Sequence, residues 1–161
     1  MTTLHYVKKA RKAIKGTDIR KGDSYYWWQF AFSQKQVSKE RPRRSQYMTR
    51  SSYLGQIYDL EDDIAAMTIE DLSDNCLDDF VSQIENIRDE AETSLDNIPE
   101  QLKEASAGAT LQEYIDNLES WQSDLEQIDF SPLSDEYEDD EEKEEALEEL
   151  LSEIQGTSYP G

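Results

Sequence analysis

The segment LDDFVSQIENIRDEAETSL at residues 77–95 decides the fold, because its apolar residues recur at steps of three and four. That period places them on one face of a helix. The segment LQEYIDNLESWQSDLEQI at residues 111–128 repeats the pattern. Two such stripes with a short connection are expected to fold back as an antiparallel helical hairpin. The sequence therefore predicts a body built mainly of helices.

The connection between the two stripes contains helix breakers. The segment NIPE at residues 97–100 interrupts the first stripe. Since proline is favoured at a first helical position, either a short helix runs through Lys103 or one long helix is kinked there. Residues 106–109 predict a turn, and Thr110 is expected to cap the second helix, which Pro132 ends.

Further helices are expected on both sides of this hairpin. Upstream, Ser45 is a good cap for a helix that runs to about Met67. Downstream, residues 134–145 are an acidic low-complexity run, for which we expect a flexible tether. Apolar residues at helical spacing over 147–154 predict a partly ordered last helix. Residues 156–161 are expected to form a frayed end.

The first third of the chain follows a different pattern. Residues 4–15 carry basic and apolar residues at helical spacing and predict a short basic helix, which Gly16 ends. The aromatic segment at residues 25–32 alternates with period two and predicts a strand. We expect residues 36–39 to form a return strand and residues 18–20 to add a short third strand.

The alternation assigns the aromatic side chains to two faces. Trp28, Phe30 and Phe32 are expected to form the core. Tyr25 and Trp27 are then displayed on the opposite face of the strand. In the alternative arrangement, both faces are buried.

Together these patterns predict an α+β chain that is mostly α. A small basic β-hairpin head is expected at residues 1–45, and an acidic antiparallel helical hairpin or bundle at residues 46–131. An acidic flexible tail with a possible short helix follows at residues 132–161. The apolar fraction of 36% in 161 residues favours helices with one apolar stripe over a large compact core.

Charge is sorted along the chain. Residues 1–50 contain 13 Lys/Arg and 3 Asp/Glu, whereas residues 51–161 contain 3 Lys/Arg and 34 Asp/Glu. The first part therefore carries a net charge of +10 and the second a net charge of −31. Such asymmetry is typical of a chain that contacts a polyanion with its basic part or carries an acidic tail.

The basic aromatic head is expected to bind DNA or another polyanion through residues 1–50, with double-stranded DNA as the first choice. A two-stranded ribbon fits the major groove, and cations neutralise phosphate. The residues assigned to phosphate are Arg20, Lys21, Lys35, Lys39, Arg43 and Arg44, and those assigned to stacking or groove packing are Tyr25 and Trp27. In the alternative, the basic residues only solvate the rim or pair with the chain's own acidic helices.

The acidic helices at residues 71–130 are expected to hold a protein partner or to self-associate. The predicted interface residues are Leu77, Phe80, Ile84, Tyr114, Leu118 and Trp121. Two alternatives remain open. The acidic surface imitates DNA and inhibits a host defence or DNA-processing protein, or the chain is a virion or assembly component.

Nothing in the sequence predicts catalysis, a metal or a cofactor. His5 is the single histidine and Cys76 the single cysteine, so neither a histidine-based metal site nor a disulfide is expected. The N-terminus lacks the apolar run of a secretory signal, and no segment is apolar for long enough to span a membrane. We therefore expect a non-enzymatic, cytoplasmic protein.

Parts of the sequence resemble known phage proteins. The segments IRKGDSYYWWQFAF and KQVSK, with the helix from Ser45, resemble the arm-binding amino-terminal domains of phage-type tyrosine recombinases. That resemblance implies a three-stranded sheet followed by a helix, although Ser33-Gln34-Lys35 stands where an Asn-Gly turn is usual. More broadly, KKARKAIKGTDIRKGDSYYWWQF, RPRRSQYMTRSSYLGQIYDLEDDI and LDNIPEQLKEASAGATLQEYIDNLESW resemble short bacteriophage accessory proteins. This implies a viral origin, and a host cytoplasmic location, without a mechanism.

Overall fold

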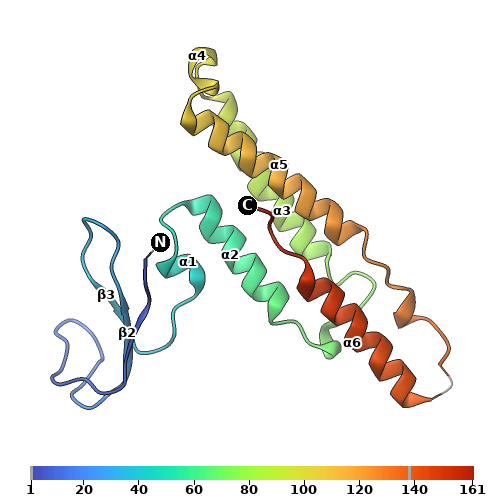
Figure 1. Ribbon diagram of the computed structural model, residues 1–161, viewed down its shortest axis with the longest axis horizontal. Coiled ribbons are helices and arrows are strands. Elements are labelled where there is room, and N and C mark those ends of the chain that lie inside the picture. The colour runs from blue at the N-terminus through green and yellow to red at the C-terminus, as the bar shows by residue number, and fades with distance from the viewer. Residues whose placement is uncertain (1, 138) are drawn as a thin grey trace. The chain divides into compact units, whose positions relative to one another are not determined.

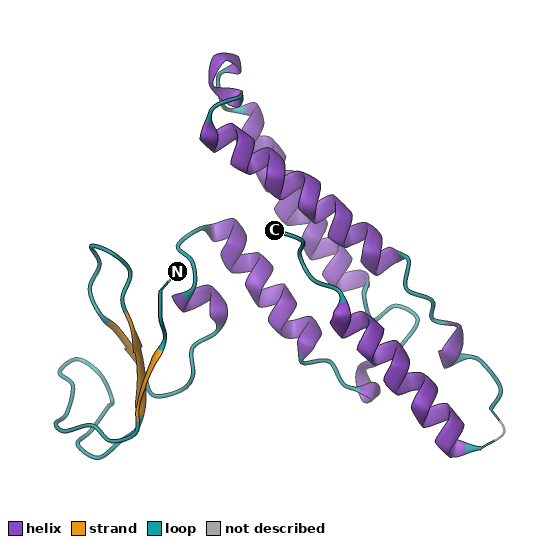
Figure 2. Cartoon of the chain, viewed as in Figure 1, coloured by secondary structure: helices purple, strands orange, loops and turns teal. Residues whose placement is uncertain are grey.

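The computed structural model describes residues 2–137 and 139–161 and confirms an α+β fold that is mostly α (Figures 1 and 2). Tertiary contacts divide the chain into an N-terminal unit, Met1–Asp62, and a helical unit, Asp63–Gly161. The boundary falls inside helix α2 (Ser52–Ala65).

The N-terminal unit contains a three-stranded antiparallel sheet in the order β1–β2–β3 (Figure 2). Its strands are β1 (His5–Val7), β2 (Tyr25–Trp28) and β3 (Gln36–Ser38). In the central strand, Trp27 lies opposite His5 on one side and Val37 on the other. Because cross-strand partners share a face, these three side chains lie on one face of the sheet.

The basic helix expected over residues 4–15 is wrong, and so is the third strand expected at residues 18–20. The third strand is β1, and residues 8–24 form a long irregular loop. Aromatic and β-branched residues favour strands, and Tyr6 finds an aromatic partner across the sheet, with its ring centroid 5.0 Å from that of Tyr26. Strand pairing therefore overrides the local helical spacing of the basic residues.

Strand β2 is shorter than the sequence predicts. It ends at Trp28, which is buried as expected, whereas Phe32 is fully exposed and has a φ of 60°. The backbone N–H and the hydroxyl of Ser33 both donate to the carbonyl of Phe30, at 3.1 and 2.9 Å. This turn ends the period-two alternation, so the expected core position of Phe32 is wrong.

The single helix expected from Ser45 to about Met67 is divided into α1 (Arg44–Tyr47) and α2. The break is made by short polar side chains, which compete with the helix for backbone groups. The amide of Ser51 donates to Oγ1 of Thr49 at 3.0 Å, and the amide of Leu54 donates to Oγ of Ser51 at 3.4 Å.

The helical unit contains the expected antiparallel hairpin (Figure 1). It consists of α3 (Asp78–Asp96), the short α4 (Glu100–Lys103) and α5 (Ser106–Glu126). Helix α5 includes residues 106–109, where a turn was expected. A Cβ atom at Gly108 would collide with the carbonyl of Lys103, so only glycine permits this close approach of α4 and α5.

The apolar stripes of α3 and α5 cover each other. Of the six residues predicted to bind a protein partner, four are buried in the chain's own core, namely Leu77, Ile84, Leu118 and Trp121. Phe80 and Tyr114 are half-buried. Those four side chains therefore pack within the chain itself.

The C-terminal segment is more ordered than expected. The 3₁₀ helices η1 (Ile69–Asp71) and η2 (Ser131–Leu133) contact α6 (Asp140–Gly156), which begins within the acidic run expected to be a tether. Residue 138 of that run lies outside the described residues. Leu150 and Ile154 lie on the apolar side of the amphipathic helix α6. They are buried because this side packs against the rest of the helical unit.

The last residues are not a frayed end. Tyr159 is 7% exposed, and its ring meets that of Trp121 edge-on at a centroid distance of 6.4 Å. Nε2 of Gln155 donates to the carbonyl of Met67 at 2.9 Å. These contacts hold the C-terminal residues on the helical unit.

Candidate polyanion site

The loop at residues 8–24 of the N-terminal unit is closed at its base by backbone pairing. The amide of Ala10 donates to the carbonyl of Asp23 at 2.7 Å, and the amide of Gly22 donates to the carbonyl of Ala10 at 2.9 Å. Gly22 has a φ of 101°, which residues with a side chain rarely adopt. The chain therefore returns to β2 through a turn that requires glycine.

The tip of the loop is closed in the same way. The amide of Ile14 donates to the carbonyl of Ile19 at 3.0 Å, and Gly16 between them has a φ of 82°. Thr17 adds a hydroxyl that donates to the carbonyl of Ile14 at 2.9 Å. With Ile19 only 2% exposed, the loop has its own apolar anchor.

This loop and one face of the sheet border a half-open pocket of about 540 Å³, here called the basic pocket. Its apolar lining comes from the loop and from all three strands, through Val7, Ala10, Ile14, Tyr25 and Val37. Its cationic lining consists of Lys9, Arg11, Lys12, Lys15 and Lys35. The pocket thus combines an apolar interior with a dense group of positive charges.

The five cations of the basic pocket are not neutralised within the described chain. No acidic residue lines the pocket, and no ion pair among residues 2–137 and 139–161 involves any of the five. Lys39, by contrast, forms an ion pair, with its Nζ 3.0 Å from Oδ2 of Asp23. Uncompensated like charges in one place favour a bound anion.

Asp23 is the carboxylate nearest in sequence to β2, and it is directed to the base of the loop. It accepts a hydrogen bond from the backbone amide of Arg20 at 3.0 Å, and this bond together with Lys39 holds the pKa of Asp23 below its usual range. A lowered pKa in the folded state means that the contribution of Asp23 to stability is lost only as the pH falls through that pKa. At neutral pH, Asp23 closes the loop as an anion.

Trp27 is engaged within the sheet. Its ring stacks on His5 with a centroid distance of 4.0 Å and an interplanar angle of 13°. The ammonium of Lys35 lies 3.6 Å from the ring centroid of Trp27, which is a cation–π contact. Trp27 therefore positions a pocket cation, whereas the sequence assigned it to stacking on bases.

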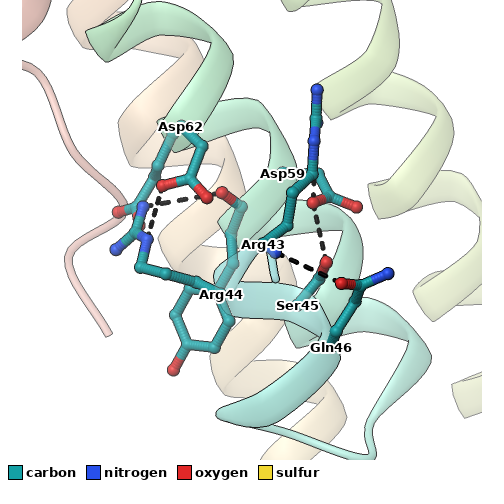
Figure 3. A network of polar contacts seen from close by, with 8 residues as sticks. Arg43, Arg44, Ser45, Gln46, Asp59 and Asp62 are labelled. Atoms are coloured by element: carbon teal, nitrogen blue, oxygen red, sulfur yellow. Dashed lines mark hydrogen bonds and ion pairs between the residues drawn. The ribbon is translucent and has the colours of Figure 1, made fainter. Parts of the chain in front are cut away.

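Arg44 is held by α2 (Figure 3). Its Nε lies 2.6 Å from Oδ1 of Asp62, and its Nη2 lies 3.0 Å from Oε2 of Glu61. The guanidinium also lies 5.3 Å from the ring centroid of Tyr58. Burial lowers the pKa of Arg44, but the hydrogen bonds and charges of Asp62 and Glu61 outweigh burial and raise that pKa above its ordinary value.

Neighbouring residues complete the link between α1 and α2. Nη1 of Arg43 lies 3.6 Å from Oδ1 of Asp59, and the hydroxyl of Ser45 donates to the same oxygen at 2.7 Å (Figure 3). The backbone amide of Arg43 donates to Oε1 of Gln46 at 3.2 Å. The two arginines therefore hold α1 against α2.

Replacing Arg44 with alanine is expected to lower the free energy of unfolding of the N-terminal unit by about 1 kcal/mol, since 34% of its side chain is exposed and solvent screens the pairs. Urea denaturation measures the change, with Arg41→Ala as the control at a neighbouring exposed arginine. Polyanion affinity should stay unchanged. If the variant kept its stability and lost polyanion affinity, Arg44 would instead contact phosphate, as the sequence predicted.

The structure separates the eight predicted nucleic-acid contacts into groups. Tyr25 and Lys35 line the basic pocket, and Trp27 lies beside Lys35. Arg20 and Lys21 are exposed on the loop outside the pocket lining. The three that face carboxylates are Lys39, Arg43 and Arg44.

Four pocket cations are not among the residues that the sequence assigned to phosphate, namely Lys9, Arg11, Lys12 and Lys15. Their helical spacing placed them at the polar positions of a short basic helix, and Lys9, Arg11 and Lys12 were expected only as part of the positive charge around the aromatic hairpin. A usable signal was present in Gly16 and Gly22, because two glycines separated by five residues after a basic run are typical of a turning loop.

Comparison with protein families, with curated proteins and with solved structures finds no match to this chain. In the described part of the chain, no cluster of three or more His, Cys, Asp or Glu side chains is arranged to hold a metal ion. Within the same residues, no helix has both the length and the apolar character needed to cross a bilayer.

Proposed function

We propose that this chain is a binding protein that holds a polyanion, most simply a nucleic acid, on the basic pocket of its N-terminal unit. The observation that carries the proposal is the group of five unneutralised cations around an apolar interior. Nucleic acids offer both matching features, since phosphates attract cations and bases offer flat apolar faces.

The charge of the two units supports an assignment to the N-terminal unit. Met1–Asp62 contains 13 Lys/Arg and 6 Asp/Glu and has a net charge of +7. Asp63–Gly161 contains 3 Lys/Arg and 31 Asp/Glu and has a net charge of −28. A polyanion is attracted to the first unit and repelled by the second. Within the described part of the first unit, the basic pocket gathers five cations that form no ion pair.

The salt dependence of binding tests the proposal. The full chain is titrated into a fluorescently labelled oligonucleotide, and anisotropy gives the binding constant K at salt concentrations above about 0.1 M, where charges are screened within about 10 Å. If about five phosphates are neutralised, log K should fall against log salt with a slope of about −3.5 for a single strand or −4.5 for a duplex.

Two results would contradict the proposal. One is the absence of binding at the lowest salt concentration. The other is a slope near zero, which would indicate a contact without phosphate neutralisation. Either would favour the acidic helices as the interacting surface, with a basic protein as the partner.

A further inference from the structure

We propose that the basic pocket takes one unpaired nucleotide, with its base in the apolar interior and its flanking phosphates on the surrounding cations. This rests on the proposed function and adds a preference for single-stranded over double-stranded nucleic acid. It replaces the double-stranded DNA expected from the sequence.

The size of the pocket fits one nucleotide. Ligand pockets for small molecules are typically about 300–1,000 Å³, and the basic pocket measures about 540 Å³. Its walls come from two separate parts of the chain, the loop at residues 8–24 and the sheet, so a ligand inside it has contacts on more than one side.

The chemistry of the lining calls for a ligand with an apolar part. A site for phosphate alone needs only cations and amide groups. Here Val7, Ile14 and Val37 form an apolar interior, and the half-buried ring of Tyr25 offers an aromatic surface beside them. A base stacks on such a ring whatever its sequence, because every base has a flat π-face.

The concave shape favours an unpaired base. In a duplex the bases are stacked and paired, and only their edges are accessible in the grooves. A base must leave the stack to enter a pocket, which costs a few kcal/mol in a duplex and much less in a single strand. Trp27, which the sequence assigned to stacking or groove packing, is instead engaged by His5 and Lys35.

Three ligands of matched length separate this inference from the proposed function. Anisotropy competition compares a 12-nucleotide single strand of mixed sequence, the corresponding 12-base-pair duplex, and an inorganic polyphosphate chain of 12 phosphates. We expect the single strand to bind at least about 10-fold more tightly than polyphosphate, since stacking of one base contributes about that factor, and more tightly than the duplex. If none of the three binds, the proposed function fails. If polyphosphate or duplex binds as tightly as the single strand, the unpaired-nucleotide inference alone is overturned.

Variants of Tyr25 test where the base lies. Tyr25→Ala should lower single-strand affinity about 10-fold and leave polyphosphate affinity unchanged, while Tyr25→Phe keeps the ring and should bind like the unmodified chain. A far-ultraviolet circular dichroism spectrum equal to that of the unmodified chain shows that the alanine variant is folded. If that variant loses both ligands, Tyr25→Leu, which keeps apolar volume without a flat ring, is measured in the same way.

Phe32 provides the matched control, because it is a fully exposed aromatic residue on the same hairpin outside the pocket lining. Phe32→Ala should leave single-strand affinity unchanged. A loss with Phe32→Ala equal to that with Tyr25→Ala, or no loss with either Tyr25→Ala or Tyr25→Leu, would overturn the placement of the base in the pocket.

Discussion

Replacing Trp121 with alanine is expected to lower the free energy of unfolding of the helical unit by about 3–5 kcal/mol. The side chain is completely buried, and it connects α5 to the C-terminal residues through its edge-on contact with Tyr159. Since domains are typically stable by about 5–15 kcal/mol, this is a large share of the total. Urea denaturation followed by far-ultraviolet circular dichroism measures it.

Trp121→Phe is the control for this prediction. Among the described residues, the buried Nε1 of Trp121 has no hydrogen-bond partner, so phenylalanine removes an unsatisfied donor while keeping an aromatic ring. We expect a loss of only about 1 kcal/mol, from the smaller ring. If Trp121 instead served a protein partner, as the sequence predicted, alanine would change the oligomeric state and leave the stability of the isolated chain unaltered.

Reversing two pocket charges, with Arg11→Glu and Lys12→Glu together, is expected to lower the affinity for a nucleic acid by about 100-fold or more. Each reversal removes one attraction to phosphate and adds one repulsion, and each such change near the surface is worth several-fold in affinity at moderate salt. Anisotropy against the same labelled oligonucleotide measures the loss, and the salt slope should become shallower by about 1.4 for a single strand or about 1.8 for a duplex.

The matched control reverses Arg20 and Lys21, which lie on the same loop but outside the pocket lining. It changes the net charge by the same amount, so it reports the effect of overall charge alone. We expect a loss of less than about 10-fold. Equal losses from the two double variants would show that the N-terminal unit attracts polyanions as a diffuse positive surface, without a specific role for the basic pocket.

The helices could be predicted because their signals are periodic over many residues. The stripes at residues 77–95 and 111–128 each span several turns, and the structure places them in α3 and α5. The shorter signals were less reliable. Twelve residues at helical spacing, 4–15, became a strand and a loop, because cross-strand pairing of Tyr6 and Val7 outweighs a weak local preference.

The candidate site shows the same limit. Tyr25 and Lys35 could be identified because an aromatic strand and its basic neighbours are visible in the sequence. The pairing of Arg44 with Asp62 could not, since the two residues are 18 positions apart and a helix break lies between them. Likewise, no local pattern shows that the loop at residues 8–24 turns its cations over one face of the sheet.

By itself, the sequence determined the sorting of charge, the mostly helical composition and the antiparallel hairpin of the acidic part. Those features depend on residue type and on spacing along one helix, both of which are local. Only the tertiary structure decided which cations are neutralised within the chain and which are collected around an apolar interior. That choice depends on long-range pairing of backbone and side chains, whose energies are realised only when the distant segments have come together.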